Sequence, residues 1–343
     1  MSDAQPRGAT EMAAKINPFD TLLQMAGGYC LPRCLHVVAD LGVADALDET
    51  PRTASDLAAS VGAHPDALGR VLRLLAAHGV FEMQGAETFR HSSASQLLRS
   101  DHPQSMRAFA RMLGLPILWS SFGAMEHSVR TGLPAVAEVF PGGFWEYLAQ
   151  HPEEGRVFNA AMVARAQGAV AGILASYDFS GFDLIGDIGG GSGHLLRAVL
   201  DTAPSAKGVL FELPHVIEEA ADLASERLTL QAGDFFRDGL PSCDAYLLME
   251  IIHDWADEEA VAILQAIRRA APAHAMLLLI ETIVPDDPGP DWSKVLDMIM
   301  LTLVGGRQRT QQEYEALLDQ SGFVLEREID TGAGISILEA RAA

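Results

Sequence analysis

Apolar positions in the C-terminal half of the chain follow two alternating periods. Runs of strand length are separated by stretches in which apolar residues recur with helical spacing. The expected strands are 184–188, 208–211, 228–232, 245–252, 275–280, 323–329 and 334–340, and the expected helices include 215–224, 257–270, 292–303 and 310–320. Such alternation forms a mostly parallel sheet covered on both faces, so residues 176–343 are predicted to form an α/β, doubly wound, Rossmann-like domain.

The N-terminal half has helical spacing through most of its length. The spacing predicts helix over residues 18–47, broken near a pair of glycines. Residues 53–91 predict a short helix, a turn, a second helix and a hairpin, which together are typical of a winged-helix module. Helical spacing returns over 103–175. Residues 1–175 are therefore predicted to form a separate, helical domain that contains the winged helix.

This winged helix permits two interpretations. Arg70 and Arg73 on its second helix would suit DNA recognition, whereas the Ala, Leu and Val that make up most of that helix would suit a packing or dimerisation unit. The 343 residues include 24 basic and 46 acidic side chains, for a formal net charge of −22. Because phosphate binding needs a basic surface, this charge disfavours nucleic acid and anionic membranes as partners, and we favour the packing unit.

The cysteines and the N-terminus bear on the cellular compartment. Cys30, Cys34 and Cys243 are too few for a disulfide framework, and their surroundings do not follow a metal-site pattern. No apolar run approaches the roughly 18 residues of a membrane span, and the polar N-terminus lacks a signal-peptide core. We therefore expect no bound metal, no membrane partner and a reduced, cytoplasmic setting.

The stretch 184–195 carries the strongest signal for a ligand. Its apolar run ends in Asp187 and continues into four glycines within five residues and then a helix. A strand, a glycine-rich turn and a helix N-terminus in this order bind ligands at the carboxyl edge of an α/β sheet. The dinucleotide pattern fails, because its third glycine falls on His194. A carboxylate before the turn repels pyrophosphate but suits a ligand with an ammonium group and no phosphate, such as S-adenosylmethionine.

Polar and aromatic residues follow the next strands at the same predicted edge. Glu212 ends the second strand, where an acidic side chain can accept both ribose hydroxyls. Asp234 and Phe235 follow the third strand, where a carboxylate and a ring face suit the amine and the plane of a purine. Taken alone, Asp234 is equally well explained by an ordinary acidic loop.

His253 follows the fourth strand, where it is well placed for proton transfer. Its ordinary pKa near 6.5 makes an imidazole a workable base around neutral pH. The next strand brings Glu281 to the same edge, and Glu313 lies in the first turn of a helix capped by Thr310. A carboxylate near a catalytic His fixes its tautomer and stabilises its protonated form. For Glu313, electrostatics at the helix start explains the residue equally well.

Large apolar side chains gather over residues 103–175, among them Phe158 and Met162. Most are expected to be core, although Met and aromatic clusters also line clefts for flat organic substrates. The segment 133–143 has two prolines and two adjacent glycines and is predicted to be a loop over such a cleft. The N-terminal domain is thus expected to cover the substrate pocket as well.

Six motifs occur together, in the order and at the spacings typical of one family. They are DIGGGSG (187–193), FELPHV (211–216), GDFF (233–236), IIHDWADEEA (251–260), IETIVPD (280–286) and GGRQRTQQEYEALL (305–318). With them the chain resembles, over about residues 24–340, the S-adenosylmethionine-dependent small-molecule O-methyltransferases of the plant-caffeate and bacterial natural-product type. That resemblance implies a winged-helix-containing dimerisation domain ahead of a Rossmann-like methyltransferase domain, and a homodimer formed through the former.

The resemblance also implies roles for individual residues. His253 is then the general base, with Glu281 and Glu313 orienting it. The predicted cofactor contacts are Asp187, Gly189, Gly191, Glu212, Leu213, Asp234, Phe235, Met249 and Trp255, and the predicted substrate contacts are Phe158, Met162, Asp297 and Met298. Many relatives have Asp at the position of Glu212, and plant members have Lys at that of Met249, so another group must do the work of that lysine.

These residues predict direct methyl transfer to a hydroxyl of a small aromatic metabolite. A phenol with a pKa around 10 stays protonated at neutral pH, and His253 would take its proton as the oxygen attacks. No metal is needed for this step. The alternatives are methylation of nitrogen or carbon on the same scaffold, which needs less help from a base, and a winged-helix regulator that senses a metabolite.

Overall fold

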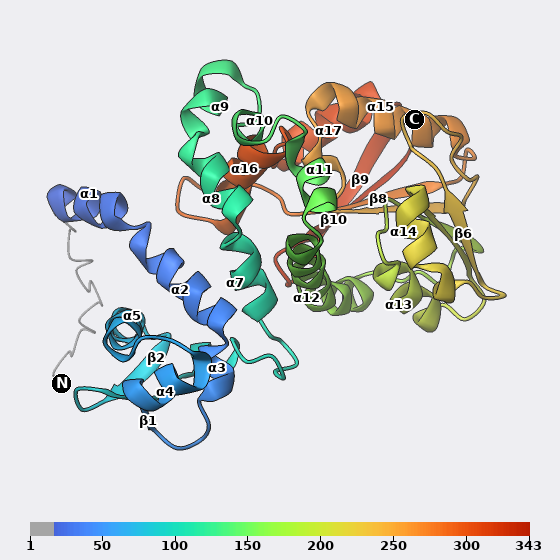
Figure 1. Cartoon of the computed structure of the whole chain (residues 1–343). Coiled ribbons are helices and arrows are strands. Elements are labelled where there is room, and N and C mark those ends of the chain that lie inside the picture. Colours follow the sequence, from blue (N-terminus) through green and yellow to red (C-terminus); the bar gives the residue numbers. More distant parts are fainter. Residues whose placement is uncertain (1–16) are drawn as a thin grey trace, which may run out of the picture. The chain divides into compact units, whose positions relative to one another are not determined.

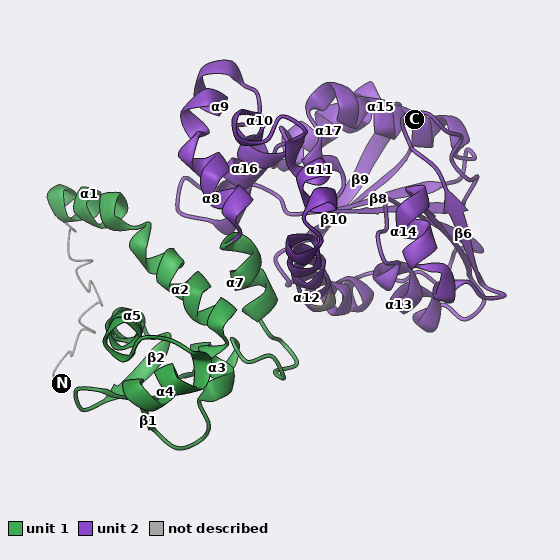
Figure 2. Ribbon diagram, viewed as in Figure 1, with its two compact units in different colours: residues 1–114 green, residues 115–343 purple. Residues whose placement is uncertain are grey.

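The computed structural model describes residues 17–343, which fold into two compact units (Figures 1 and 2). Unit 1 ends at Gly114, and unit 2 runs from Leu115 to Ala343. The sequence placed this boundary near residue 175 instead. The helices between residues 115 and 175 group with unit 2. The longest of them, Pro152–Ser176, packs on the helix His194–Thr202 that follows the glycine turn, and the two share a core.

Unit 1 contains the predicted winged helix. Its helices are α1 (Pro18–Gly27), α2 (Cys30–Leu41), α3 (Val43–Ala46), α4 (Ala54–Val61), α5 (Pro65–Ala77), α6 (Ser93–Gln96) and α7 (Arg107–Leu113). Its strands are β1 (Arg52–Thr53), β2 (Phe81–Gln84) and β3 (Thr88–His91), paired antiparallel in the order β1-β3-β2. Thr53 caps α4 by accepting a hydrogen bond from the Asp56 amide at 3.1 Å, and Gly62 ends it at φ 68°.

The core of unit 1 leaves its first helix uncovered. Leu57 and Phe81 are almost fully buried between α4, α5 and the hairpin. In contrast, α1 buries none of its residues, and Phe19, Leu22 and Met25 are 70%, 68% and 74% exposed. An apolar helix face that is exposed to this extent is typical of a surface that another protein covers.

Unit 2 begins with five helices that precede the sheet. They are α8 (Pro116–Gly123), α9 (Met125–Thr131), α10 (Val136–Val139), α11 (Gly143–Gln150) and α12 (Pro152–Ser176). The short α10 lies inside the segment expected to be a loop. Within the described chain, α12 is the one helix long and apolar enough to cross a membrane, contrary to the expectation that no segment comes near that length. Its residues Ala169 and Ile173 nevertheless lie in a core shared with the sheet.

A seven-stranded sheet forms the centre of unit 2. Its strands are β4 (Leu184–Ile188), β5 (Lys207–Glu212), β6 (Leu228–Ala232), β7 (Ala245–Met249), β8 (Met276–Glu281), β9 (Phe323–Asp330) and β10 (Ser336–Ala342). They lie in the order β6-β5-β4-β7-β8-β10-β9. The first five of these pair in parallel, and β10 is antiparallel to both β8 and β9. The predicted mostly parallel, Rossmann-like sheet is confirmed.

Helices cover both faces of this sheet (Figure 1). The helices that share a core with it are α12, α13 (His194–Thr202), α14 (Pro214–Glu219), α15 (Asp257–Ala270) and α17 (Gln311–Gln320), whereas α16 (Trp292–Leu303) packs on α8 and α9. The 3₁₀ turns are η1 (Ala221–Leu223) and η2 (Ile252–Asp254). Successive residues of β7 point to opposite faces, so Leu247 packs in the core with α12 and α13, and Leu248 in the core with α15 and α17.

The strand order creates one position suited to a ligand. β4 and β7 are neighbours, although the chain visits β5 and β6 between them. Their carboxyl ends therefore flank a topological switch point, where α/β sheets bind ligands. β7 ends at Met249, three residues before the predicted end, because Glu250 takes a left-handed φ of 54° and η2 follows. This early turn brings the residues of η2 to the switch point.

Candidate active site

The glycine turn after β4 wraps closely around one carboxylate. Gly189, Gly191 and Gly193 have φ angles of 73°, 55° and 65°, in the left-handed region that only glycine adopts readily. A Cβ on Gly190 would lie 2.3 Å from Asp187 Oδ2, so a side chain at that position does not fit. The turn needs glycine for its backbone angles and for this close approach.

Asp187 is 1% exposed, and neither of its oxygens meets the geometry of a hydrogen bond within the described residues. Burial and, to a lesser extent, the Glu212 carboxylate raise its pKa to about 7, while the nearby Leu196 amide opposes the rise. A buried carboxylate without a partner is costly to the fold. His194 Nε2, on the first residue of α13, is likewise buried without a hydrogen-bond partner in the described part of the chain. Both atoms indicate a polar or positively charged ligand beside the turn.

Glu212 at the end of β5 joins the turn to the neighbouring strand. Its Oε2 accepts a hydrogen bond from the Gly191 amide at 3.1 Å, and its Oε1 accepts one from the Leu213 amide at 2.7 Å. Each carboxylate oxygen can accept a second hydrogen bond. The residue is half-buried, so it retains the capacity to accept from the hydroxyls of a sugar.

Two loops bring aromatic rings together on the other side of the switch point. Phe235, after β6, lies 5.9 Å from Trp255, after η2, in an edge-to-face arrangement at 86°. Phe236 completes the cluster at 4.8 Å from Trp255. The Asp234 carboxylate accepts a hydrogen bond from the Phe236 amide at 2.9 Å, so part of its role is to shape this loop. The rings offer apolar faces of the kind that a purine needs.

Sequence reasoning missed an ion pair at the end of β7. Arg165 of α12 donates to both oxygens of Glu250, at 2.9 and 3.1 Å from its Nε, and lies 3.3 Å from Thr282 Oγ1. The signal in the sequence is weak, because a single Arg within the apolar part of α12 has no charged neighbour that would indicate its partner. Met249, predicted to contact the cofactor, is partly buried and packs against the core on the α12 and α13 side.

His253 lies in η2 and is 6% exposed. Its Nδ1 is 3.3 Å from Glu281 Oε2, and its Nε2 is 3.4 Å from Asp254 Oδ1. Burial alone would lower the pKa of His253, but the Glu281 and Asp254 carboxylates outweigh burial and raise it to about 9. Burial also raises the pKa of Asp254, to about 6. His253 and Asp254 therefore form an imidazole–carboxylate pair in which both pKa values are raised.

Glu281 is placed as the sequence predicted. The residue ends β8, is 0% exposed, and its Oε1 accepts a hydrogen bond from the Ile252 amide at 2.9 Å. This bond fixes the carboxylate relative to η2 and leaves Oε2 directed at His253. A buried carboxylate in this position stabilises an imidazolium and orients the ring.

Glu313 does not reach His253. Its Oε2 accepts hydrogen bonds from the amide and hydroxyl of Thr310 at 2.8 and 3.1 Å, and its Oε1 lies 3.1 Å from Arg307 Nη2. These bonds make a capping box at the start of α17. The helix-start explanation of Glu313 therefore fits the structure, and the predicted contact with the imidazole is absent from the described bonds of this residue.

Gln308 occupies the place predicted for Glu313. Its amide Nε2 is 2.8 Å from His253 Nδ1, and the residue is 3% exposed. Asp297, predicted to border the substrate pocket, accepts a hydrogen bond from the Gln308 backbone amide at 2.9 Å. Sequence reasoning missed Gln308 because a Gln in a loop between two helices carries no periodic or charge signal.

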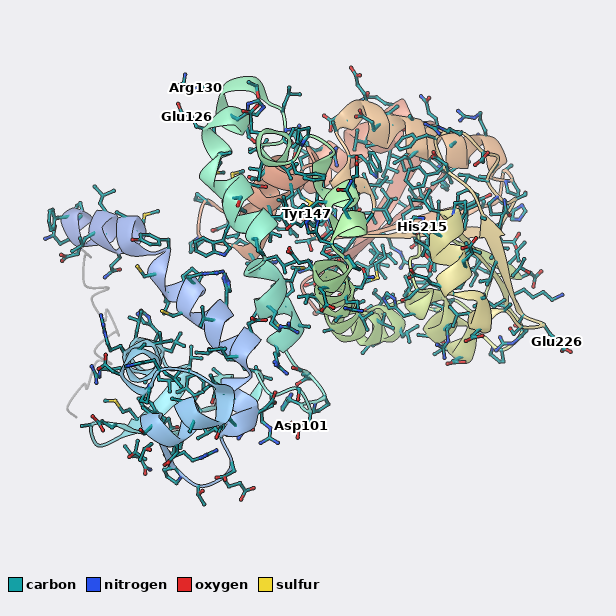
Figure 3. All side chains as sticks on the ribbon, in the orientation of Figure 1. Asp101, Glu126, Arg130, Tyr147, His215 and Glu226 are labelled. Carbon is teal, nitrogen blue, oxygen red and sulfur yellow. The ribbon has the colours of Figure 1, made fainter. Side chains whose placement is uncertain are left out.

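The predicted substrate residues lie on separate helices of unit 2. Phe158 of α12 packs edge-to-face against Phe144 and Trp145 of α11, with ring centroids 5.4 and 5.7 Å apart. Met162 of α12 and Met298 of α16 are half-buried. Beside this cluster, Tyr147, which is labelled in Figure 3, stacks on His151 at 3.9 Å. Half-buried aromatic and Met side chains are suited to a flat apolar ligand.

The strand ends thus present several carboxylates, one of them unpaired, together with a glycine turn and an aromatic cluster. Unpaired Asp187, the close approach at Gly190 and the rings of Phe235 and Trp255 fit a small cation that carries a purine and no phosphate, which describes S-adenosylmethionine. Among residues 17–343, no three His, Cys, Asp or Glu side chains are arranged to hold a metal ion.

Fold and site together define an α/β enzyme domain of the methyltransferase type preceded by a winged-helix unit. Residues 122–324 match the model of the O-methyltransferase domain, and residues 23–101 match that of the O-methyltransferase dimerisation domain. The chain therefore belongs to the O-methyltransferase family, whose members use S-adenosylmethionine.

Similar proteins act on several acceptors. The chain is 40% identical, over 93% of its length and 95% of the relative, to phenazine O-methyltransferase PhzM of Lysobacter antibioticus. It is 40% identical, over 84% of its length and 85% of the relative, to 8-amino-8-demethylriboflavin N,N-dimethyltransferase of Streptomyces davaonensis. The solved O-methyltransferase NcsB1 of neocarzinostatin biosynthesis, in complex with S-adenosylmethionine and 2-hydroxy-5-methyl naphthoic acid, matches with a TM-score of 0.80 and 31% identity, over 96% of this chain and all of that one.

Proposed function

We propose that this protein methylates a phenolic hydroxyl of a small aromatic metabolite, with His253 as the general base. The observation that carries this proposal is the buried imidazole at the switch point, flanked by Glu281 on one ring nitrogen and Asp254 on the other. An imidazole held in this way is equipped to take one proton and to keep the resulting charge stabilised. The related O-methyltransferases support oxygen as the acceptor atom.

The cofactor would be held by residues of the glycine turn and the neighbouring strand ends. When bound, S-adenosylmethionine supplies a methyl group attached to a positively charged sulfur. Asp187, Gly189 and Gly191 would receive its amino-acid part, and Glu212 its ribose. The purine would lie near Asp234, Leu213 and the rings of Phe235 and Trp255. Arg165 and Glu250, which form an ion pair, leave no uncompensated positive charge at the end of β7 to repel the sulfonium.

The raised pKa of His253 matters for this chemistry. With a pKa of about 9, only about 1% of the free imidazole would be neutral at pH 7. However, a second positive charge in the site would disfavour the imidazolium, because like charges repel strongly where little water screens them. His253 is therefore expected to lose its proton more readily in the loaded site. The same charge would also lower the pKa of an acceptor phenol, ordinarily near 10, so that base and acceptor stay close in pKa and the proton moves without a large penalty.

The aromatic and Met side chains of α11, α12 and α16 would form one wall of the acceptor site. Phe158, Met162 and Met298 are the residues assigned to it, while Asp297 acts on Gln308. A panel of phenolic metabolites, incubated with isotopically labelled cofactor and analysed by mass spectrometry, tests the proposal. Label in an aryl ether is the expected result. Label only in amines, or in no acceptor at all, would contradict it.

Nitrogen methylation is the second candidate. It is favoured by the N,N-dimethyltransferase that matches this chain as closely in identity as the phenazine enzyme does. An aromatic amine needs little help from a base. In contrast, Glu281, Asp254 and Gln308 surround His253 in a way that serves proton removal. The panel above therefore includes matched phenol and aniline pairs on the same ring, and the ratio of the two products decides between the candidates.

We further propose that unit 1 holds two copies together rather than reading DNA. The dimerisation-domain match spans the winged helix, and the exposed apolar residues of α1 adjoin it. Leu22→Asp or Met25→Asp should then lower the molar mass measured by light scattering from that of a dimer to that of a monomer. Val129→Asp, at a side chain equally exposed on α9, serves as the control and should leave the mass unchanged.

We also propose a reduced, cytoplasmic setting. Cys30, Cys34 and Cys243 are all free thiols. Burial raises the pKa of Cys243 to about 12, which keeps this thiol protonated and unreactive. Fractionation of cells that express the tagged protein tests the assignment.

A further inference from the structure

The imidazole of His253 has two neighbours on the same ring nitrogen. The Gln308 amide is 2.8 Å and Glu281 Oε2 is 3.3 Å from Nδ1. For Nε2 to accept a proton from an acceptor hydroxyl, the neutral ring must carry its own proton on Nδ1. Whatever accepts a hydrogen bond from that Nδ1–H therefore selects the reactive tautomer.

We propose that Gln308 is a positioning residue, whose amide oxygen accepts a hydrogen bond from Nδ1–H of His253 and thereby fixes the tautomer in which Nε2, the nitrogen beside Asp254, carries no proton. The proposal rests on the proposed role of His253 as the base. Rotation of an amide by 180° exchanges its oxygen and its NH₂ group at one point in space. Gln308 Oε1 and Glu281 Oε2 are both buried without a hydrogen bond. An Nδ1–H shared between Glu281 and the rotated amide would supply a donor to both oxygens.

The backbone around Gln308 is fastened to the backbone around His253. The Arg307 amide donates to the His253 carbonyl at 2.9 Å, and a Cβ on Gly306 would lie 2.1 Å from that same carbonyl oxygen. The buried Arg309 donates to the Ile252 carbonyl at 3.1 Å. The segment that carries Gln308 therefore cannot move independently of η2, and the distance between amide and imidazole is set by the main chain.

A neutral amide differs from a carboxylate in what it does to the imidazole. The charged or titratable groups around His253 are Glu281 from β8, Asp254 from η2, Glu250 from β7, Arg165 from α12, Arg309 from the loop after α16 and Tyr314 from α17. Three of these are carboxylates that already favour the imidazolium. Gln308 orients the ring without adding a fourth negative charge, which would make the proton harder to release.

Nitrogen NMR of protein labelled with ¹⁵N-histidine tests this directly, because the two ring nitrogens report which of them carries the proton. The His253 signals are assigned by their loss in His253→Ala, and the titration is followed from about pH 6 to about pH 10, where the imidazole becomes neutral. Wild-type protein is expected to show the proton on Nδ1 in the neutral form. Gln308→Leu should give a mixture of tautomers and a lower kcat, with a titration midpoint that is unchanged or lower. Gln308→Glu should raise the midpoint by about one pH unit or more and move the acid limb of kcat/KM in the same direction.

Gln311→Glu is the matched control, since it adds the same charge at an exposed position three residues further on. It should leave both the tautomer and the titration of His253 as in the wild type. The proposal is overturned if Gln308→Leu keeps the wild-type tautomer, even where Gln308→Glu shifts the midpoint, because any added carboxylate would do that. A purely structural role would lower the melting temperature and leave the nitrogen shifts unchanged. The NMR result does not depend on turnover, so it is separable from a failure of His253 as the base.

Discussion

Arg165 and Glu250 form a partly buried ion pair that links the long helix α12 to the carboxyl end of β7. The guanidinium donates to both carboxylate oxygens, and Glu250 itself holds a left-handed φ of 54°. Burial would raise the pKa of Glu250, but Arg165 outweighs it and holds the pKa below the ordinary value. The stabilisation is therefore present at neutral pH and is lost as the pH falls into the range where a carboxyl group protonates.

This pair gives the first prediction. Arg165→Met should lower the free energy of unfolding by about 2 to 3 kcal/mol, since it leaves a carboxylate without a partner in a largely buried position. The double variant with Glu250→Gln should recover part of that loss, because no charge then remains to be buried. Urea unfolding at neutral pH measures both values. Equal losses in the single and double variants would show that the unpaired Glu250 charge is not the cause of the loss.

Replacement of His253 tests the base. His253→Ala should slow methyl transfer by about 10² to 10⁴-fold, the usual contribution of a positioned base, while the affinity for S-adenosylmethionine stays within a few-fold. Turnover is measured by labelled product, and affinity by calorimetry. His274→Ala removes an exposed histidine that pairs with Asp244 and should change neither quantity. A His253→Ala enzyme that turns over as fast as the wild type would refute the base role.

Asp187 gives a prediction about how the stability of the protein changes with pH. Its raised pKa of about 7 means that the free protein resists ionisation of this buried group, so the wild type loses stability as the pH rises toward and past 7. Asp187→Asn has no such group, and its stability relative to wild type should increase between about pH 5 and pH 8. The same variant should bind the cationic cofactor more weakly.

Thermal unfolding at about pH 5 and about pH 8, with and without S-adenosylmethionine, measures the effect of Asp187→Asn on stability and on cofactor binding. Asp201→Asn, on the exposed surface of α13, is the control and should follow the wild type. A relative stability that does not change with pH would mean that the Asp187 carboxylate is solvated or paired in solution.

Replacement of Glu313 tests whether this residue orients His253, as the sequence predicted, or caps α17, as in the structure. Glu313→Ala removes the capping box of α17 and should lower stability by about 1 kcal/mol, with turnover nearly unchanged. Glu281→Gln, in contrast, should slow turnover strongly, because it removes the buried charge beside His253. Glu315→Ala, at an exposed position two residues further along α17, controls for the general effect of losing a charge. A large loss of turnover in Glu313→Ala with stability intact would restore its predicted role beside the base.

The sequence alone determined the order and type of the main elements. Periodicity and glycine placement were sufficient because each strand or helix is defined by neighbours within a dozen residues. Helix 257–270 and strands 184–188 and 228–232 lie where the pattern put them. His253 and Glu281 were also predictable, since His253 follows β7 and Glu281 ends β8, and the carboxyl ends of parallel strands meet at one edge.

Only the tertiary structure decided which side chains meet across long separations. Gln308 lies against His253, and Arg165 against Glu250, although 55 and 85 residues separate these partners in the chain. Glu313 faces its own helix start instead. The division after Gly114 likewise follows from how α12 packs and not from its composition. Such contacts depend on how loops and helices pack in three dimensions, and local sequence carries no periodic signal for them.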